Sequence, residues 1–196
     1  MGIKIEDIKK LRVKTGVGIM DAKSALTEAS GDLEKALEVL RKRGLSKASK
    51  RAGREAKEGI VSSYIHPGGR IGAMVELNCE TDFVAKTDDF KNLAHDIAMQ
   101  VAATDPEYAT VEDVSEEVIK KEKRIEKEKL QKEKKPENII EKILQGKMEN
   151  YYKQAVLIKQ VFIKDENKTV EDLIAEAVSK LGENIKIGRF SRFQIK

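Results

Sequence analysis

The chain has 196 residues, of which 40% are hydrophobic and 37% are charged, and its formal net charge is +4. It contains no run of about 18 apolar residues that could span a bilayer, and no apolar segment of a signal peptide follows the N-terminus. The single cysteine excludes an internal disulfide. We therefore predict a soluble, cytoplasmic protein with no membrane partner, long enough for one medium domain or two small ones.

Residues 1–43 are predicted to form a compact three-helix domain. Apolar residues recur every three or four positions in three successive segments, which is the pattern of amphipathic helices. The first two segments end at Gly16 and Gly31, where glycine tolerates the left-handed conformation that terminates helices. Asp32 is a suitable N-cap for the third helix. We expect that helix to end at Gly44, after a basic last turn that complements its dipole.

Residues 44–58 are predicted to be a basic linker, helical at most in part. Small and basic residues dominate, and no apolar stripe is wide enough to join a core. Such a segment is either a solvated tether or an arm that binds nucleic acid. Nucleic-acid arms usually interleave aromatic residues or cluster basic ones more densely, so the tether is favoured. We expect no direct contact with nucleic acid.

Residues 59–196 are predicted to form an α+β core, in which helices pack on a small antiparallel sheet. Alternating apolar residues at 60–66 and 71–77 flank Pro67-Gly68-Gly69-Arg70, which is a β-hairpin signal. A highly charged helix at 115–135 is expected to pack one thin apolar stripe or to meet a partner. The later elements are expected in this order: a helix at 137–152, a buried strand at 155–163, a helix capped by Thr169 that ends at Gly182, and a strand at 185–195.

Residues 78–90 are predicted to form a corner between a strand and a helix, and this corner is the most informative stretch. Phe90 begins the apolar face of the following helix and is expected in the core. Phe83 lies outside that register, in a polar turn. From the residues alone, ordinary packing beneath the turn is the favoured interpretation of Phe83, and outward presentation is the alternative.

Residues that carry enzyme chemistry are sparse. His66 and His95 are isolated, and Cys79 has no second cysteine, so neither a zinc site nor a redox pair is indicated. A catalytic thiol would require the fold to bring His95 to Cys79. The phosphate-binding pattern GxxxxGK[ST] is absent. Four acidic residues near the corner raise the question of a metal site: Glu80, Asp82, Asp88 and Asp89. Asp88 and Asp89 are better explained as negative charge at a helix N-terminus. We expect an interaction protein without catalytic residues, metal or cofactor.

Two long segments carry a resemblance to a known family. Residues 15–26, TGVGIMDAKSAL, followed by Gly31-Asp32, resemble the N-terminal module of the bacterial translation elongation factor Ts family. Residues 76–86, ELNCETDFVAK, resemble the core signature of that family. Shorter motifs follow in the family's order: Lys135-Pro136, Gln145-Gly146-Lys147, Gln160-Val161-Phe162 and Gly182-Glu183-Asn184-Ile185. The resemblance covers essentially the whole chain and fits the short form with one core subdomain. The chain departs from the family at Val161, where Pro is common, and at Ile19, where Met is commoner.

This resemblance implies a ubiquitin-associated-like fold for the N-terminal domain and a core that also dimerises. The family's role is guanine-nucleotide exchange on elongation factor Tu, the GTPase that delivers aminoacyl-tRNA. Its Asp-Phe pair enters the GTPase near the Mg²⁺ and phosphate site, which assigns this task to Asp82 and Phe83, flanked by Thr81 and Val84.

The resemblance also implies a second contact with the GTPase and a larger assembly. The N-terminal contact would use Arg12, Ile19 and Met20. A homodimer would form a two-plus-two complex with elongation factor Tu. The competing hypothesis is a ubiquitin-associated-like adaptor, or an RNA-binding protein that uses the basic linker. RNA binding would weaken steeply with salt, whereas nucleotide exchange would depend on Phe83.

Overall fold

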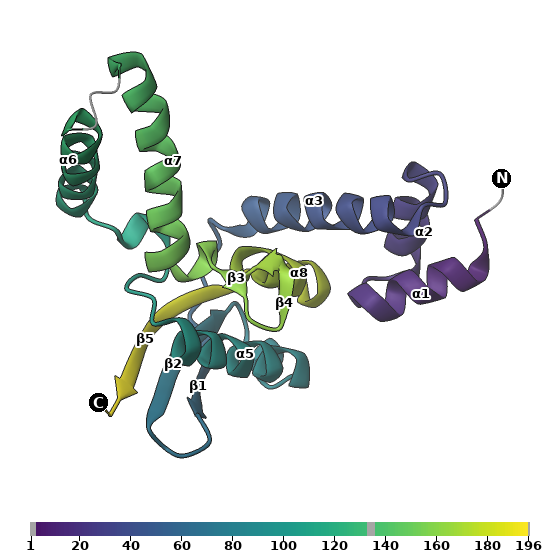
Figure 1. Cartoon of the computed structure of the whole chain (residues 1–196). Helices are drawn as coiled ribbons and strands as arrows, with labels where there is room; N and C mark the ends of the chain where they lie inside the picture. Colours follow the sequence, from purple (N-terminus) through teal and green to yellow (C-terminus); the bar gives the residue numbers. More distant parts are fainter. Residues whose placement is uncertain (1–2, 133–135, 196) are drawn as a thin grey trace.

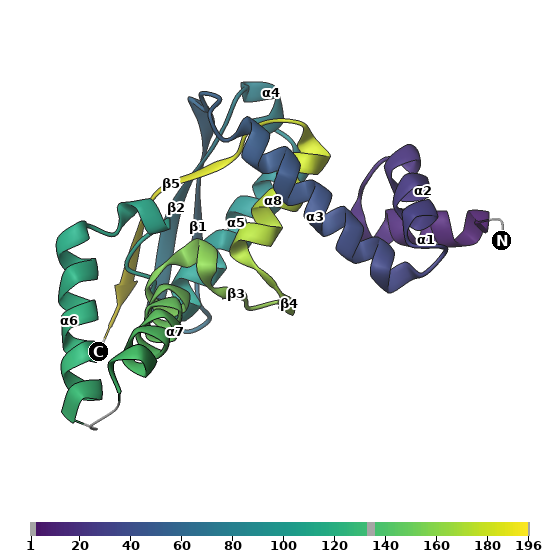
Figure 2. The ribbon, with the colours of Figure 1, turned by 90° about the horizontal axis from the view of Figure 1, so that it is seen from above.

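The computed structural model describes residues 3–132 and 136–195, and within them it shows helices around two small antiparallel sheets (Figures 1 and 2). The N-terminal part comprises α1 (Ile5–Thr15), α2 (Ile19–Glu28) and α3 (Leu33–Arg51). The middle part comprises β1 (Glu58–Ile65), β2 (Ile71–Cys79), α4 (Asp82–Ala85), α5 (Asp88–Thr104) and the 3-10 turn η1 (Val111–Asp113). The last part comprises α6 (Glu116–Lys132), α7 (Glu137–Ala155), the 3-10 turn η2 (Leu157–Lys159), β3 (Val161–Phe162), β4 (Asp165–Thr169), α8 (Val170–Leu181) and β5 (Lys186–Gln194). The predicted α+β class is confirmed.

The three N-terminal helices pack around a core of small residues and leucines, as predicted. Gly16, at φ 68°, ends α1 in the left-handed conformation. The Asp32 carboxylate caps α3 by accepting from the backbone N–H groups of Glu34 and Lys35 at 2.9 and 3.1 Å. Alanines let the helix backbones approach closely, so a short sequence still builds a core. Its buried members are Leu11, Ala22, Ala25, Leu26, Ala29 and Ala36.

Helix α3 is longer than predicted, and its expected end at Gly44 is wrong. The helix continues to Arg51, so the first half of the expected linker at 44–58 is helical. Gly44 is buried, and a Cβ at this position would lie 3.6 Å from the Ala175 carbonyl oxygen of α8. The glycine therefore marks a close approach of two helices, and tertiary packing outweighs its low helix propensity.

A bidentate ion pair fastens α3 to α8. The Arg41 guanidinium donates through Nε and Nη2 to the two carboxylate oxygens of Asp172, at 2.7 Å each. Asp172 is buried, and it also belongs to the capping box that Thr169 forms at the start of α8, as predicted. Figure 2 shows α3 running beside α8 and carrying α1 and α2 away from the sheet.

The main sheet has the strand order β1-β2-β5, with both pairs antiparallel. The predicted hairpin and the predicted last strand are therefore confirmed. Helix α5 packs across one face of this sheet, and α8 packs against both α5 and α3. The core lies between the sheet and these helices, and its members include Val75, Leu77, Phe90, Ile97 and Val178.

Helices α6 and α7 form an antiparallel hairpin that projects from the core (Figure 1). Helix α6 packs its expected thin apolar stripe against α7. Leu130 of α6 is buried there, and so are Ile140 and Met148 of α7. Residues 133–135 of that predicted helix lie outside the described residues.

The strand predicted at 155–163 is wrong. Helix α7 extends to Ala155, and only Val161 and Phe162 form a strand. Val156 and Leu157 are buried, Leu157 within the core, and the backbone there pairs with Tyr108: the Leu157 N–H donates to the Tyr108 carbonyl at 2.9 Å. An apolar run without alternation does not distinguish such a buried connection from a strand.

Candidate functional site

The corner between β2 and α5 is a short helical turn, α4. Thr81 is its N-cap, in an extended conformation, and its hydroxyl accepts from the Val84 N–H at 3.4 Å. The Thr87 hydroxyl donates to the Val84 carbonyl at 2.8 Å and caps α5 by accepting from the Phe90 N–H at 3.3 Å. Two threonine caps separated by one helical turn thus give residues 81–87 a defined shape.

Phe83 points into solvent from this turn, with 80% of its surface exposed. Its neighbours are anchored: Ala85 and Phe90 are buried, and Val84 packs against the core. The core position expected for Phe90 is confirmed. Of the two interpretations of Phe83, packing beneath the turn is wrong, because the side chain is almost fully exposed. A benzyl group exposed on a rigid turn offers apolar surface to a partner. Because the turn is already ordered, little conformational entropy is lost when the partner covers it.

Asp82 carries a negative charge beside Phe83. It forms an ion pair with Lys86 one helical turn later. The hydrogen bond from Lys86 holds the pKa of Asp82 below its ordinary value, so the carboxylate is ionised at neutral pH. Two other carboxylates near the corner also have partners: Glu80 accepts from the Asn184 N–H at 2.6 Å, and Asp89 pairs with Lys180 at 2.7 Å.

The loop between α8 and β5 holds the corner from behind, and the sequence patterns did not predict this contact. The Glu183 carboxylate accepts from the backbone N–H groups of Glu80 and Thr81, both at 3.0 Å, and from the Thr81 hydroxyl at 2.6 Å. Glu183 lies within a short motif that the family resemblance covers, but nothing in its local spacing assigns it a partner about a hundred residues away.

The three N-terminal residues expected to bind the partner lie on α1 and α2 and are exposed. Met20 is 75% exposed and Ile19 58% exposed, and Arg12 is also at the surface. Val13, which the sequence did not single out, is 88% exposed beside Arg12. The structure does not bring these residues to the corner: α1 and α2 lie at the far end of α3 (Figure 2).

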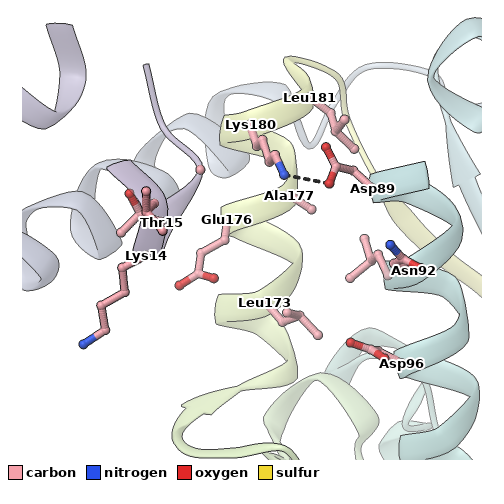
Figure 3. Close-up of a pocket in the computed structure, with 13 residues that line it drawn as sticks. Lys14, Thr15, Asp89, Asn92, Asp96, Leu173, Glu176, Ala177, Lys180 and Leu181 are labelled. Atoms are coloured by element: carbon pink, nitrogen blue, oxygen red, sulfur yellow. Dashed lines mark hydrogen bonds and ion pairs between the residues drawn. The ribbon is translucent and has the colours of Figure 1, made fainter. Parts of the chain in front are cut away.

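A cavity of about 310 Å³ lies where the end of α1 meets the core. Figure 3 shows its walls, formed by the α1 terminus, α5 and α8, with the Lys180–Asp89 ion pair at one end. Gly16 sits against α8, since a Cβ there would lie 3.1 Å from the Lys180 side chain. None of the sequence-predicted site residues lines this cavity.

Cys79 and the histidines occupy separate places. Cys79 is buried beneath the corner, where its thiol donates to the Thr81 carbonyl at 3.1 Å, and burial raises its pKa. Both His66 and His95 instead contact Tyr64 in β1. Tyr64 pairs with Ala73, six residues along β2 from Cys79, so a Cys79–His95 nucleophile is not assembled.

The described part of the chain contains no helix long and apolar enough to cross a membrane. In the same residues, no three His, Cys, Asp or Glu side chains gather into a group suited to a metal ion. Three of the four acidic residues near the corner, Glu80, Asp82 and Asp89, form hydrogen bonds or ion pairs with protein groups.

Comparison with known proteins gives one consistent result. Residues 22–196 match the family model described as elongation factor TS. A relative from Moorella thermoacetica, "Elongation factor Ts", is 56% identical over 193 residues, covering 98% of this chain and 95% of the relative. The "Elongation factor Ts" of Fervidobacterium nodosum is 53% identical over 195 residues, covering 100% of this chain and 99% of the relative. The "Elongation factor Ts" of Syntrophomonas wolfei is 55% identical over 193 residues, covering 98% of this chain and 90% of the relative.

Proposed function

The chain belongs to the elongation factor Ts family, and from this premise we propose that it is the guanine-nucleotide exchange factor for elongation factor Tu in the cytoplasm. The corner inserts Asp82 and Phe83 near the Mg²⁺ and phosphate site of the GTPase. The observation that carries the proposal is the exposure of Phe83, at 80%, on a turn that is capped by Thr81 and anchored in the core through Ala85.

Binding energetics explain how such a corner promotes release of GDP. Burying an exposed Phe side chain contributes about 2 kcal/mol, or roughly 30-fold in affinity. If only the nucleotide-free GTPase offers that pocket, linkage requires that the factor weaken GDP binding by the same ratio. The Asp82 carboxylate adds a negative charge where the GTPase holds a metal and phosphate oxygens, and so competes with the bound nucleotide for their positive partners.

The N-terminal helices provide a second contact through Arg12, Ile19 and Met20. Met20 and Ile19 expose apolar surface that a partner would cover. Because α3 is one continuous helix docked on α8, the spacing between this contact and the corner is set by a rigid element in place of the tether expected from the sequence. A rigid spacing lowers the entropy lost when both contacts form. We keep the division at 1–43, 44–58 and 59–196 as a proposal, with the first half of 44–58 forming the end of α3 in place of a flexible tether.

The alternative, RNA binding through the basic segment, is disfavoured by the way its charges are used. Lys47 pairs with Asp21 at 3.3 Å, Arg54 with Glu80 at 3.5 Å, and Lys57 with Glu55 at 2.7 Å. A phosphate backbone would have to displace these carboxylates before it gained a contact with any of these three residues. The apolar contacts proposed for Phe83, Ile19 and Met20 require no such exchange.

We also propose that two copies associate through the outer face of the main sheet and form a two-plus-two complex with elongation factor Tu. Helices leave this face uncovered, and five of its apolar side chains are each at least 50% exposed: Val61, Ile65, Met74, Phe193 and Ile195. The Glu76–Arg189 ion pair lies on the same face. An uncovered antiparallel face is suited to a two-fold interface in which the same surface serves both copies. Phe193→Glu should therefore halve the mass measured by light scattering, whereas Val161→Glu, at an exposed position on β3, should not. A wild type that is already monomeric would contradict the dimer.

Release of labelled GDP from elongation factor Tu tests the exchange function. The wild type should accelerate release, and Phe83→Ala should lose most of the acceleration. Ile139→Ala, which removes an exposed apolar side chain from α7, is the matched control and should retain full activity. No acceleration by the wild type would refute the exchange function, while an active Phe83→Ala would refute only the role of Phe83.

A further inference from the structure

The end of β2 leaves backbone donors that the sheet does not use. The ladder between β1 and β2 ends at the pair Glu58–Cys79, so the N–H groups of Glu80 and Thr81 lie beyond it. Buried or half-buried N–H groups need an acceptor. Both of these N–H groups donate to one oxygen of the Glu183 carboxylate, at 3.0 Å each. The other oxygen accepts from the Thr81 hydroxyl at 2.6 Å.

Helix α8 delivers Glu183 to the corner through its C-terminal glycine. Gly182 adopts φ 82° and ends the helix in the left-handed conformation, which turns the chain away from the helix axis. The next residue then faces the corner. A carboxylate has only acceptor sites, so it matches three converging donors, and its charge makes each hydrogen bond stronger than a neutral one.

The contact between the 183–184 loop and the corner is reciprocal, and it extends to the segment that follows α3. The Asn184 N–H donates to the Glu80 carboxylate at 2.6 Å, and the Asn184 side chain donates to the Arg54 carbonyl at 2.7 Å. Arg54 also pairs with Glu80 at 3.5 Å. Asn184 is buried, so these bonds are shielded from water. The corner, the 183–184 loop and the segment after α3 are thus joined by one set of hydrogen bonds.

We propose that Glu183 is a positioning residue for nucleotide exchange: it locks Thr81 and thereby presents Phe83 in one orientation before the GTPase binds. This inference rests on the proposed function. Thr81 is the N-cap of the turn that carries Phe83, so a shift of Thr81 redirects the aromatic ring. Side chains held by a supporting layer of hydrogen bonds keep the geometry that a binding site needs. Glu183 itself faces the back of the corner and acts only through Thr81.

Three substitutions test the role of the carboxylate. Glu183→Ala removes all three acceptor contacts and should lower the maximal rate of GDP release about tenfold. Glu183→Gln keeps one oxygen that can accept the two N–H groups, and should restore part of the rate. Glu126→Ala, which removes a carboxylate paired with Lys129 and Lys147 on the α6–α7 hairpin, should leave the rate unchanged.

The concentration dependence separates positioning from loss of binding or folding. Because the N-terminal contact remains in Glu183→Ala, the concentration for half-maximal acceleration should change less than the maximal rate. Circular dichroism of each variant should show the wild-type helix content at the assay temperature. A lower affinity with an unchanged maximal rate would overturn the positioning role. A maximal rate of GDP release that is no higher for Glu183→Gln than for Glu183→Ala would overturn it as well.

A double-mutant cycle with Phe83→Ala gives the sharpest result. If Glu183 acts only by presenting Phe83, adding Glu183→Ala to Phe83→Ala should cause no further loss of rate. Additive losses would overturn the inference, as would a Glu183→Ala variant as fast as the wild type. Failure of the exchange function is distinguishable, because it would appear as wild-type protein that does not accelerate release. A fully active Phe83→Ala would refute the role of Phe83, and the positioning role of Glu183 with it.

Discussion

The ion pair between Arg41 and Asp172 should be worth more than any surface pair on the same helix, and Arg41→Met tests this. Arg41 supplies two hydrogen bonds of 2.7 Å to a carboxylate that is 3% exposed. Without Arg41, the Oδ1 atom of Asp172 loses its hydrogen bond from the guanidinium. The Oδ2 atom keeps its hydrogen bonds from the Thr169 N–H and hydroxyl, at 3.0 and 2.8 Å. Stranding a fully buried charge costs about 3–5 kcal/mol, but Arg41 is half exposed and water can enter, so we expect about 2 kcal/mol.

Thermal unfolding followed by circular dichroism measures this loss. For a chain of this size, about 2 kcal/mol corresponds to a decrease of about 4–8 °C in Tm. Arg43→Met is the matched control, because Arg43 lies on the same helix and pairs with the exposed Glu28 at 2.6 Å. An exposed pair contributes less than about 1 kcal/mol. Equal decreases for the two variants would refute the reasoning.

The pH dependence gives a second check on the same pair. Burial alone would raise the pKa of Asp172, but hydrogen bonds from Arg41 and Thr169 outweigh burial and lower the pKa from its ordinary value of 3.8. A lowered pKa stabilises the folded state above the unfolded-state pKa, and this stability is lost as pH falls through the folded-state pKa. The Tm difference between wild type and Arg41→Met should therefore be full near neutral pH and shrink below about pH 4. A difference that grows in acid would contradict the assignment.

Three further predictions follow from the packing of the core. Gly44→Ala should raise the free energy of unfolding by up to about 1 kcal/mol, because the added methyl meets Ala175 at an ordinary distance of 3.6 Å and glycine is costly inside a helix. A lower free energy of unfolding, measured by urea denaturation, would mean that the two helices cannot accommodate the methyl group. Deletion of residues 1–31, which retains the Asp32 cap and the whole of α3, should leave a folded core that binds elongation factor Tu more weakly; an unfolded product by circular dichroism would contradict this. Cys79 should react with a thiol reagent only after unfolding, since its side chain is buried and burial raises its pKa; rapid labelling of the native protein would show that the corner opens.

Local sequence signals predicted the elements whose structure is set by neighbouring residues. The alternation around Pro67-Gly68-Gly69-Arg70 predicted β1 and β2, and Thr169 as an N-cap predicted the start of α8. In these segments the residues that determine the structure lie within a few positions of one another, so periodicity and cap chemistry are sufficient.

Long-range packing accounts for the segments where prediction failed. Gly44 looked like a helix end because its burial against Ala175 depends on a helix more than a hundred residues later. Residues 155–163 looked like a strand because they are apolar, yet their backbone pairs with Tyr108 in a connection. Tertiary contacts override local propensity in both cases.

The candidate site shows the same division. Phe83 was identifiable because an aromatic residue lay outside the helix register, but the residues alone favoured the wrong orientation. Its exposure follows from the threonine caps and from the burial of Ala85 and Phe90, which fix the direction of the turn. The support by Glu183 could not be predicted from spacing, since it joins two loops 102 residues apart in sequence.

The relative affinity of this protein for nucleotide-free and GDP-bound elongation factor Tu tests the exchange mechanism most directly. Titration calorimetry of both forms, with wild type and Phe83→Ala, measures the ratio that linkage equates with the weakening of GDP binding. We predict that the wild type binds the nucleotide-free form far more tightly, and that Phe83→Ala reduces this ratio roughly 30-fold. Equal affinity of the wild type for the two forms would contradict the exchange function, and an unchanged ratio for Phe83→Ala would contradict the role of the corner.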